Sequence, residues 1–138
     1  MKLSVKSDYA ARAVLGLARH YPNRVALTME QVAGEQGLPP KYLPQILLEL
    51  KAEGILRSVR GMAGGYLLAR PPAEITLRDV LQAVDGPLFE APGLTSSDTP
   101  PELRRAWQRL RQSLEAATAI TFQQLLEEGA EKEKMYYI

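Results

Sequence analysis

The sequence predicts a mainly α-helical fold with one small β-hairpin and one long helix toward the C-terminus. Three observations support this fold class. Capping residues and apolar side chains at helical spacing recur through residues 1–87. A glycine-rich turn lies between two short apolar segments within residues 55–68. After a polar loop, apolar residues recur at alternating spacings of four and three.

The first two helices are predicted from their end signals. Ser7 is the expected N-cap of the first helix, and Pro22 lies where that helix must stop. Thr28 and Gln31 have the spacing of a capping box for a short second helix, which Gly37 ends. We therefore expect two helices within the first 37 residues.

Two further helices are expected on either side of the glycine-rich segment. The third runs over residues 39–53 and starts with two prolines, which fit the first turn of a helix. Its buried stripe is expected to consist of Leu43, Ile46, Leu47 and Leu50. Thr76 and Asp79 have capping-box spacing at the start of a fourth helix, and Gly86 ends it.

The segment from Ile55 to Leu68 predicts two strands joined by a turn, directly after the third helix. Glycines in that turn permit backbone conformations that other residues adopt poorly. Arg60 lies at the tip, where a narrow minor groove can admit it. A helix followed by a basic hairpin is an arrangement that reads DNA. We therefore interpret this part of the chain as a winged helix-turn-helix, with the hairpin as its wing.

Charge is distributed unevenly along the chain. Residues 1–72 contain 10 Lys and Arg against 5 Asp and Glu, whereas residues 73–138 contain 7 against 11. The basic half fits a polyanion-binding module, although such charges also occur as ordinary solvated surface. We expect four parts, namely a DNA-binding domain (1–87), a loop (88–101), dimerisation helices (102–130) and a C-terminal tail (131–138).

Several classes of function lack the residues that they need. The chain has no cysteine, which excludes disulfides, thiolate nucleophiles and thiolate-bound metals. Glu90, Asp98 and Glu102 are scattered loop carboxylates, and no catalytic triad can be assembled around His20. We therefore expect no enzymatic activity, no cofactor and no metal. The sequence shows no apolar leader and no apolar run of membrane length, so we expect a soluble cytoplasmic protein.

A long helix is predicted after the loop. Its apolar residues have the spacing of a coiled-coil seam and are Leu103, Trp107, Leu110, Leu114 and Ala117. Such a seam can also pack on its own domain. This helix is longer than a small domain can cover, so we expect it to hold a homodimer together. A short capped helix from Ile120 to Leu126, ended by Gly129, is expected to follow.

Several motifs resemble the Rrf2 family of bacterial winged-helix repressors. The most specific is the wing, Ser58-Val59-Arg60-Gly61 followed by Gly64-Gly65-Tyr66-Leu67-Leu68. Supporting residues are Lys6, Tyr9-Ala10, Tyr42-Leu43 and Gln45. The resemblance covers nearly the whole chain. It implies a homodimer that binds a palindromic operator, with the third helix in the major groove and the wing in the minor groove. It excludes an iron–sulfur sensor of the usual kind, because the loop that holds the cluster cysteines in such members has none here.

The resemblance also implies a set of DNA-binding residues, which are Lys6, Thr28, Lys41, Tyr42, Gln45, Ser58, Arg60, Gly61, Gly64 and Gly65. Lys41 can pair with a phosphate, and the Gln45 amide can match an adenine edge. Lys41 can equally be an ordinary exposed lysine, and Tyr42 a residue at the boundary of the core. Pro44 and Asp8 depart from the family pattern, which often has an acidic residue at the first position and a basic residue at the second.

The last residues, Met135, Tyr136, Tyr137 and Ile138, resemble the ending of the cysteine-metabolism regulators in this family, which form a complex with cysteine synthase. A terminal isoleucine can imitate an amino-acid substrate by placing its carboxylate in an anion-binding site. The charged stretch before it favours an extended tail, although these residues can also fold back on the dimer. We therefore expect a dimeric repressor of sulfur or cysteine genes. The alternatives are a subunit that acts mainly on a metabolic enzyme, and a family repressor that senses an unrelated small molecule.

Overall fold

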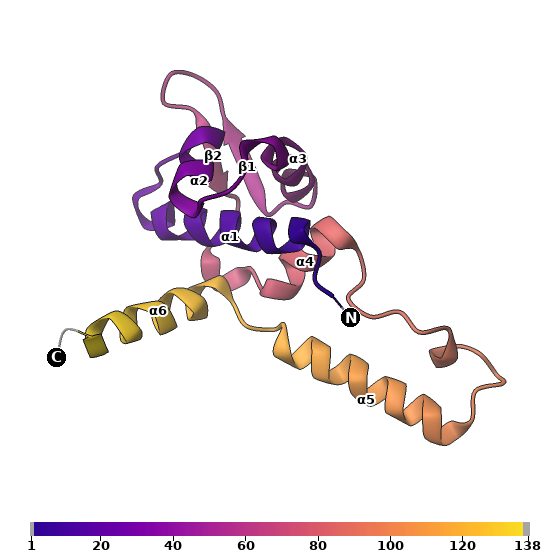
Figure 1. Cartoon of the computed structure of the whole chain (residues 1–138). Coiled ribbons are helices and arrows are strands. Elements are labelled where there is room, and N and C mark those ends of the chain that lie inside the picture. The colour runs from indigo at the N-terminus through magenta and orange to yellow at the C-terminus, as the bar shows by residue number, and fades with distance from the viewer. Residues whose placement is uncertain (1, 137–138) are drawn as a thin grey trace.

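The computed structural model describes residues 2–136 (Figure 1). Its helices are α1 (Val5–His20), α2 (Met29–Gln36), α3 (Leu43–Ala52), α4 (Leu77–Asp85), α5 (Pro101–Ala117) and α6 (Phe122–Tyr136), and its strands are β1 (Leu56–Val59) and β2 (Gly65–Leu68). The predicted fold class is confirmed, since the described residues form a helical protein with one antiparallel hairpin. Across residues 2–136, no helix has both the length and the apolar character needed to cross a membrane.

Helix α1 is the centre of the main core. Helices α2, α3, α4 and α6 and strand β2 all contact it. Ala10, Ala13 and Val14 on α1 are fully buried, and such small side chains let the neighbouring helices approach closely. A Cβ atom at Gly16 would lie 2.8 Å from the Gln36 side-chain nitrogen at the end of α2. The sequence of α1 is therefore shaped by packing on several sides.

The start of α1 differs from the prediction. Ser4, and not Ser7, is the N-cap, because the Ser4 hydroxyl accepts a hydrogen bond from the Ser7 backbone N–H at 3.0 Å. Ser7 is buried in the first turn, and its hydroxyl donates to Asp85 at the end of α4. The Ser4 hydroxyl donates to the same carboxylate oxygen at 2.6 Å. This partner lies far along the sequence, so local capping rules could not reveal it.

The structure confirms both predicted capping boxes. In α2 the Thr28 hydroxyl accepts from the Gln31 N–H while the Gln31 side chain accepts from the Thr28 N–H. Thr76 and Asp79 make the same reciprocal pair at the start of α4. Gly37 ends α2 with a left-handed φ of 61°. Each cap satisfies backbone donors that a helix N-terminus leaves without partners.

The third helix begins later than predicted. Residues Pro40–Tyr42 form a 3₁₀ turn, and the α-helix starts at Leu43. Pro44 falls in the first turn of α3, where a missing N–H leaves no intrahelical bond unmade. The predicted apolar stripe is confirmed, and its buried members are Leu43, Ile46, Leu47 and Leu50.

The hairpin is fixed to the helical core at its base. Strands β1 and β2 pair antiparallel, with Leu56 opposite Leu68 and Val59 opposite Gly65. Leu27, just before α2, adds a two-way backbone bridge to Tyr66, with hydrogen bonds of 3.0 and 2.7 Å. The wing and the helix-turn-helix are therefore joined by backbone hydrogen bonds as well as by apolar packing.

Helix α6 returns to the core after α5 (Figure 1). Thr121 and Gln124 cap it reciprocally, and Phe122 is buried in the α1 core. The Phe122 backbone N–H also donates to the Ile75 carbonyl oxygen at 3.0 Å. Helix α6 is thus anchored at its N-terminus, whereas α5 stands apart from the core in Figure 1.

Helix α6 is longer than predicted. Gly129 does not end it, because the helix continues to Tyr136. An interior glycine costs only about 1 kcal/mol relative to alanine, and the Glu, Ala and Lys residues around it favour a helix. The prediction of an extended tail from residue 131 is therefore wrong as far as Tyr136. Tyr137 and Ile138 lie outside the described residues.

Candidate nucleic-acid interface

Most of the predicted DNA-binding residues lie on α3, on the turn before it and on the hairpin, while Lys6 lies on α1 and Thr28 at the N-cap of α2. Figure 1 shows α3 beside the hairpin, whose loop projects from the same end of the molecule. The side chains of Lys41, Tyr42, Gln45, Ser58 and Arg60 are all exposed. The fold therefore brings residues from two separate segments to one end of the chain's main core.

Tyr42 is held at the start of α3 by aromatic and cationic neighbours. Its ring lies 5.6 Å from the Tyr9 ring of α1, measured between centroids, at a tilt of 54°. Lys41 Nζ lies 5.1 Å from the centroid of the Tyr42 ring, within the range of a cation–π contact. Tyr42 nevertheless remains 45% exposed. One side of Tyr42 therefore packs on α1, as a residue at the boundary of the core would, and the other side faces solvent, while contact with DNA stays a prediction.

Lys6 and Gln45 meet at a residue to which the sequence analysis assigned no function. Glu49 Oε1 accepts a hydrogen bond from Lys6 Nζ at 2.6 Å and another from Gln45 Nε2 at 3.0 Å. Burial raises the pKa of Glu49, but the hydrogen bonds from Lys6 and Gln45 outweigh it, so the pKa lies below its ordinary value of 4.5. The one sequence signal for this contact is the i, i+4 spacing of Gln45 and Glu49.

The wing combines exposed side chains with glycines that the backbone requires. Arg60 and Met62 lie at the exposed tip, and Met62 is 108% exposed. Gly61 has a φ of 110°, which side chains with a Cβ rarely adopt. A Cβ at Gly64 would lie 2.4 Å from the Val59 carbonyl oxygen. These glycines shape the turn that presents Arg60.

Two predicted contact residues have clear structural functions. A Cβ at Gly65 would lie 2.3 Å from the Leu27 carbonyl oxygen, so glycine permits the close approach of wing and core. Thr28 caps α2 through its hydroxyl. Asp8, the acidic residue at a position often basic in the family, forms an ion pair of 2.9 Å with Arg12 on the next turn of α1. The charge of Asp8 is therefore partly offset within α1.

Helix α5 presents an uncovered apolar seam. Within residues 2–136, none of its side chains is buried, and Leu103 and Leu110 are 42% and 43% exposed. The centroid of the Trp107 ring lies 6.4 Å from that of the Phe89 ring in the preceding loop. Gly93 of the same loop also approaches the Trp107 indole.

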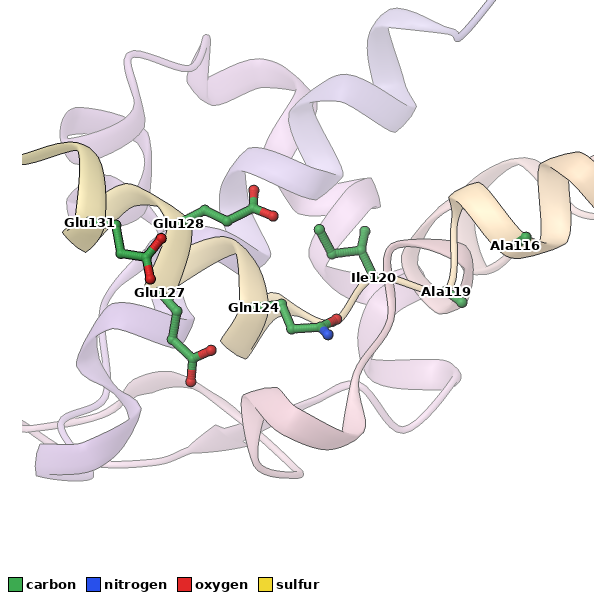
Figure 2. A pocket seen from close by; sticks show the side chains of 7 residues that line it. All are labelled: Ala116, Ala119, Ile120, Gln124, Glu127, Glu128 and Glu131. Carbon is green, nitrogen blue, oxygen red and sulfur yellow. The ribbon is translucent and has the colours of Figure 1, made fainter.

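An open pocket of about 510 Å³ lies where the chain passes from α5 to α6 (Figure 2). Ala116, Ala119 and Ile120 form its apolar part. The polar part comes from α6 and consists of Gln124, Glu127, Glu128 and Glu131. Figure 2 shows these α6 side chains along one stretch of the helix.

The residues considered for other chemistry do not converge on a site. His20 Nε2 lies 3.1 Å from Glu35 on α2, which ties the end of α1 to its neighbour. Among the described residues, no group of three or more His, Asp or Glu side chains is placed to hold a metal ion. This includes Glu90 and Asp98, which lie in the loop, and Glu102, which the structure places in the first turn of α5.

Comparisons with known proteins agree with this geometry. Residues 3–128 match the Rrf2 family, described as iron-dependent transcriptional regulators. A Mycobacterium tuberculosis protein named as an HTH-type transcriptional regulator is 40% identical over 119 residues, which cover 83% of this chain and 73% of that protein. The HTH-type transcriptional regulator CymR of Bacillus subtilis is 29% identical, with 100% of both chains covered.

Solved structures show the same fold. CymR, the global cysteine regulator of B. subtilis, superposes with a TM-score of 0.82 at 26% identity, covering 93% of this chain and 98% of that one. IscR from T. potens gives a TM-score of 0.80 at 30% identity, with coverages of 99% and 97%. The expectation that the chain is not an enzyme is confirmed, because the family and these relatives are transcriptional regulators.

The family description names iron, whereas this chain contains no cysteine. Iron–sulfur clusters are held mainly by cysteine thiolates, so the residues present do not fit a cysteine-ligated cluster. The chain lacks the cysteine ligands, but its match to the family extends over the helices, the wing and the long helix α5. The chain therefore belongs to the Rrf2 family of transcriptional regulators.

Proposed function

We propose that the chain acts as a homodimer, binds a palindromic operator and represses genes of sulfur or cysteine metabolism. The observation that carries the choice of genes is the match to CymR, the global cysteine regulator, over nearly the whole length of both chains. IscR from T. potens matches a similar share of both chains, so the absence of cysteine, which does not fit the iron–sulfur sensors of the family, also supports this choice.

For DNA reading, we propose that α3 enters the major groove and the wing enters the minor groove. Lys41 contacts a phosphate, and Gln45 reads a base edge. Arg60 at the tip of the hairpin enters a narrow, A·T-rich minor groove, where the negative potential is strongest. The exposure of all three side chains supports this assignment.

For assembly, we propose that two copies of α5 pack along the seam Leu103, Trp107, Leu110, Leu114 and Ala117. The seam has coiled-coil spacing and remains largely exposed in the single chain. A two-fold dimer would present two reading helices to the two halves of a palindrome. The division into a DNA-binding part (1–87), a loop (88–101) and dimerisation helices (102–130) is part of this proposal.

A further part of the proposal is a complex with cysteine synthase through Met135 to Ile138. It is supported by the likeness of these residues to the ending of cysteine-metabolism regulators. Because α6 continues to Tyr136, the contact would lie at the end of a helix. A protein-interaction subunit that acts mainly on such an enzyme is the alternative reading of the same residues.

A second candidate function is repression controlled by an unrelated small molecule. The pocket between α5 and α6 favours it, because its volume of about 510 Å³ falls in the range of ligand sites. Its lining belongs partly to α5, so a ligand there could alter the packing of the proposed dimer.

Selection of bound genomic fragments by the purified protein tests the proposed function. We expect enrichment of a palindrome upstream of sulfur or cysteine genes. Enrichment of a palindrome upstream of unrelated genes would retain the repressor but reject the regulon. Recovery of random fragments would reject sequence-specific binding altogether.

A further inference from the structure

Glu49 lies next to the proposed reading surface and is bound by two of its residues. Lys6 reaches it from α1, and Gln45 reaches it from the preceding turn of α3. Both donate to the same oxygen, Oε1, while Oε2 is buried without a hydrogen-bond partner among the described residues. The arrangement links Lys6, a cation of the predicted DNA-binding set, and the amide of Gln45, proposed to read a base, through one carboxylate.

We propose that Glu49 is a positioning residue for operator specificity, which orients the Gln45 amide and holds Lys6 away from the DNA backbone. This inference rests on the proposed function, because it assigns Glu49 a part in the same DNA interface. In this proposal Glu49 increases the sequence selectivity of the interface and decreases its affinity for non-specific DNA.

The orientation of Gln45 follows from its hydrogen bond to Glu49. An amide side chain can present either its oxygen or its nitrogen to a partner, and free rotation would allow both. The 3.0 Å bond from Gln45 Nε2 to Glu49 turns the nitrogen toward the carboxylate and leaves Oε1 for another donor. Adenine offers a donor at N6 beside the acceptor N7, whereas guanine offers two acceptors at O6 and N7. A fixed Gln45 oxygen therefore favours adenine over guanine.

The ion pair with Glu49 also limits what Lys6 can contribute to DNA binding. Lys6 Nζ lies 2.6 Å from Glu49, and both side chains are partly shielded, with exposures of 35% and 25%. Asp85 interacts with the Lys6 charge as well. Because the pKa of Glu49 lies below its ordinary value, the carboxylate is ionised at neutral pH. A DNA phosphate must therefore compete with Glu49 for Lys6. This competition weakens binding to every DNA sequence equally.

The test is a DNA titration of the Glu49→Gln variant of the full chain. One duplex is the selected operator, and the others are copies of it in which a single A·T pair within the α3 contact is replaced by G·C. We expect binding to random duplex to strengthen and the salt slope to steepen by about 0.9, the value for one added phosphate contact. Discrimination between A·T and G·C at one pair should fall about fivefold or more, because the amide introduced at position 49 can turn its nitrogen toward Gln45 and then no longer fixes the Gln45 oxygen toward the base; a bidentate amide contact contributes at least that much.

Glu53→Gln is the matched control. It removes the same charge from a neighbouring position, at the C-cap of α3, where the Glu53 side chain is exposed. Glu49→Gln and Glu53→Gln should therefore differ in both readouts. Identical behaviour would mean that Glu49 acts only as one negative charge near DNA, which overturns the inference.

Two background variants separate positioning from support of the fold. In Gln45→Ala, Glu49→Gln should cause no further loss of discrimination, and in Lys6→Met it should cause no further change in salt slope. Losses that persist in these backgrounds would contradict the inference.

If Glu49→Gln does not fold, Glu49→Asp takes its place. This variant keeps the charge but has a shorter side chain, so it should lose the preference for A·T; retention of that preference counts against the inference. A wild-type protein without any sequence preference would reject the proposed function itself, whereas a selective wild type with an unchanged Glu49→Gln variant rejects only the inference.

Discussion

Arg60 and Lys41 have the same charge but different surroundings. Arg60 projects from a turn that glycines shape, while Lys41 lies beside Tyr42 at the start of α3. A guanidinium at the tip of a narrow hairpin fits a groove, and an ammonium beside a helix terminus fits a phosphate. The two residues should therefore contribute to DNA binding in distinguishable ways.

Replacing these two residues separates groove reading from phosphate contact. Arg60→Ala should weaken binding to the preferred site by about 1–3 kcal/mol, with the greatest loss on A·T-rich flanks. Lys41→Ala should weaken all sequences alike and reduce the salt slope. Fluorescence titration at several salt concentrations measures both effects. Equal, sequence-independent losses for both variants would contradict minor-groove reading by Arg60.

Asp85 should contribute to stability in a pH-dependent way. Hydrogen bonds from Ser4 and Ser7 lower its pKa below the ordinary value of 3.8. A carboxyl group whose pKa is depressed by folding stabilises the protein above its unfolded pKa. That contribution is lost as the pH falls through the folded pKa.

Thermal unfolding of the wild type and of Asp85→Asn checks this linkage. We expect the wild type to melt at the higher temperature near neutral pH. The difference should narrow as the pH falls below about 4, because protonation removes the advantage of the carboxylate. A difference that stays constant down to pH 2 would show that Asp85 acts through packing and not through its charge.

At the scale of elements, α5 is distinguished by having no buried side chain among the described residues. Its seam residues Leu103 and Leu110 remain well exposed, while Phe122 at the start of α6 is buried. The two helices therefore differ in how far their apolar side chains are buried by the rest of the chain. Helix α6 is anchored to the α1 core by Phe122, whereas the described residues leave the α5 seam uncovered.

A charge placed in the α5 seam tests the proposed dimer. Leu110→Glu should dissociate the dimer, because two carboxylates would be buried against each other without partners. Gln112→Glu adds the same charge to an exposed position outside the seam and should leave the dimer intact. Sedimentation velocity distinguishes the outcomes. An unaltered dimer in Leu110→Glu would place the interface elsewhere.

Local signals predict most elements, and they fail where two local signals compete or where a distant contact decides the structure. The capping boxes at Thr28 and Thr76, and the stripe on α3, depend on neighbours within one or two turns, so the sequence reveals them. Ser4 and Ser7 are both candidate caps for α1, and the structure assigns the cap to Ser4 because the Ser7 hydroxyl donates to the distant Asp85. Gly129 is typical of a helix end, but the residues around it continue α6 to Tyr136.

The candidate interface was predicted in the same uneven way. Residues exposed on α3 and the wing follow from periodicity and from the glycine-rich motif. The contact between Lys6 and Glu49 joins residues on two helices, so no local spacing could indicate it. The requirement for Gly65 likewise comes from the approach of Leu27, which only the folded chain brings near.

For the whole molecule, the charge asymmetry matches the arrangement of parts. The basic half contains α3 and the hairpin, and the acidic half contains α5 and α6. Repulsion between DNA and the acidic half should keep that half away from the duplex. The acidic half is then available for dimerisation and partner binding.

The proposed enzyme contact should be separable from DNA binding. Deleting Ile138 is expected to abolish calorimetric binding to cysteine synthase, because the deletion removes the apolar residue proposed to fill the enzyme's pocket. Operator affinity and melting temperature should remain nearly unchanged. A lower melting temperature with enzyme binding intact or absent would assign these residues to the structure of the regulator.

The central claim, a dimer that reads a palindrome, is tested most directly by the stoichiometry and selectivity of DNA binding in one titration. The labelled operator found by selection and a scrambled duplex of equal length are titrated at fixed salt, with the mass of the complex measured by sedimentation. The account predicts two chains per operator duplex and affinity for the operator about 10³-fold or more above that for the scrambled duplex. One chain per duplex, or equal affinity for both duplexes, would contradict it.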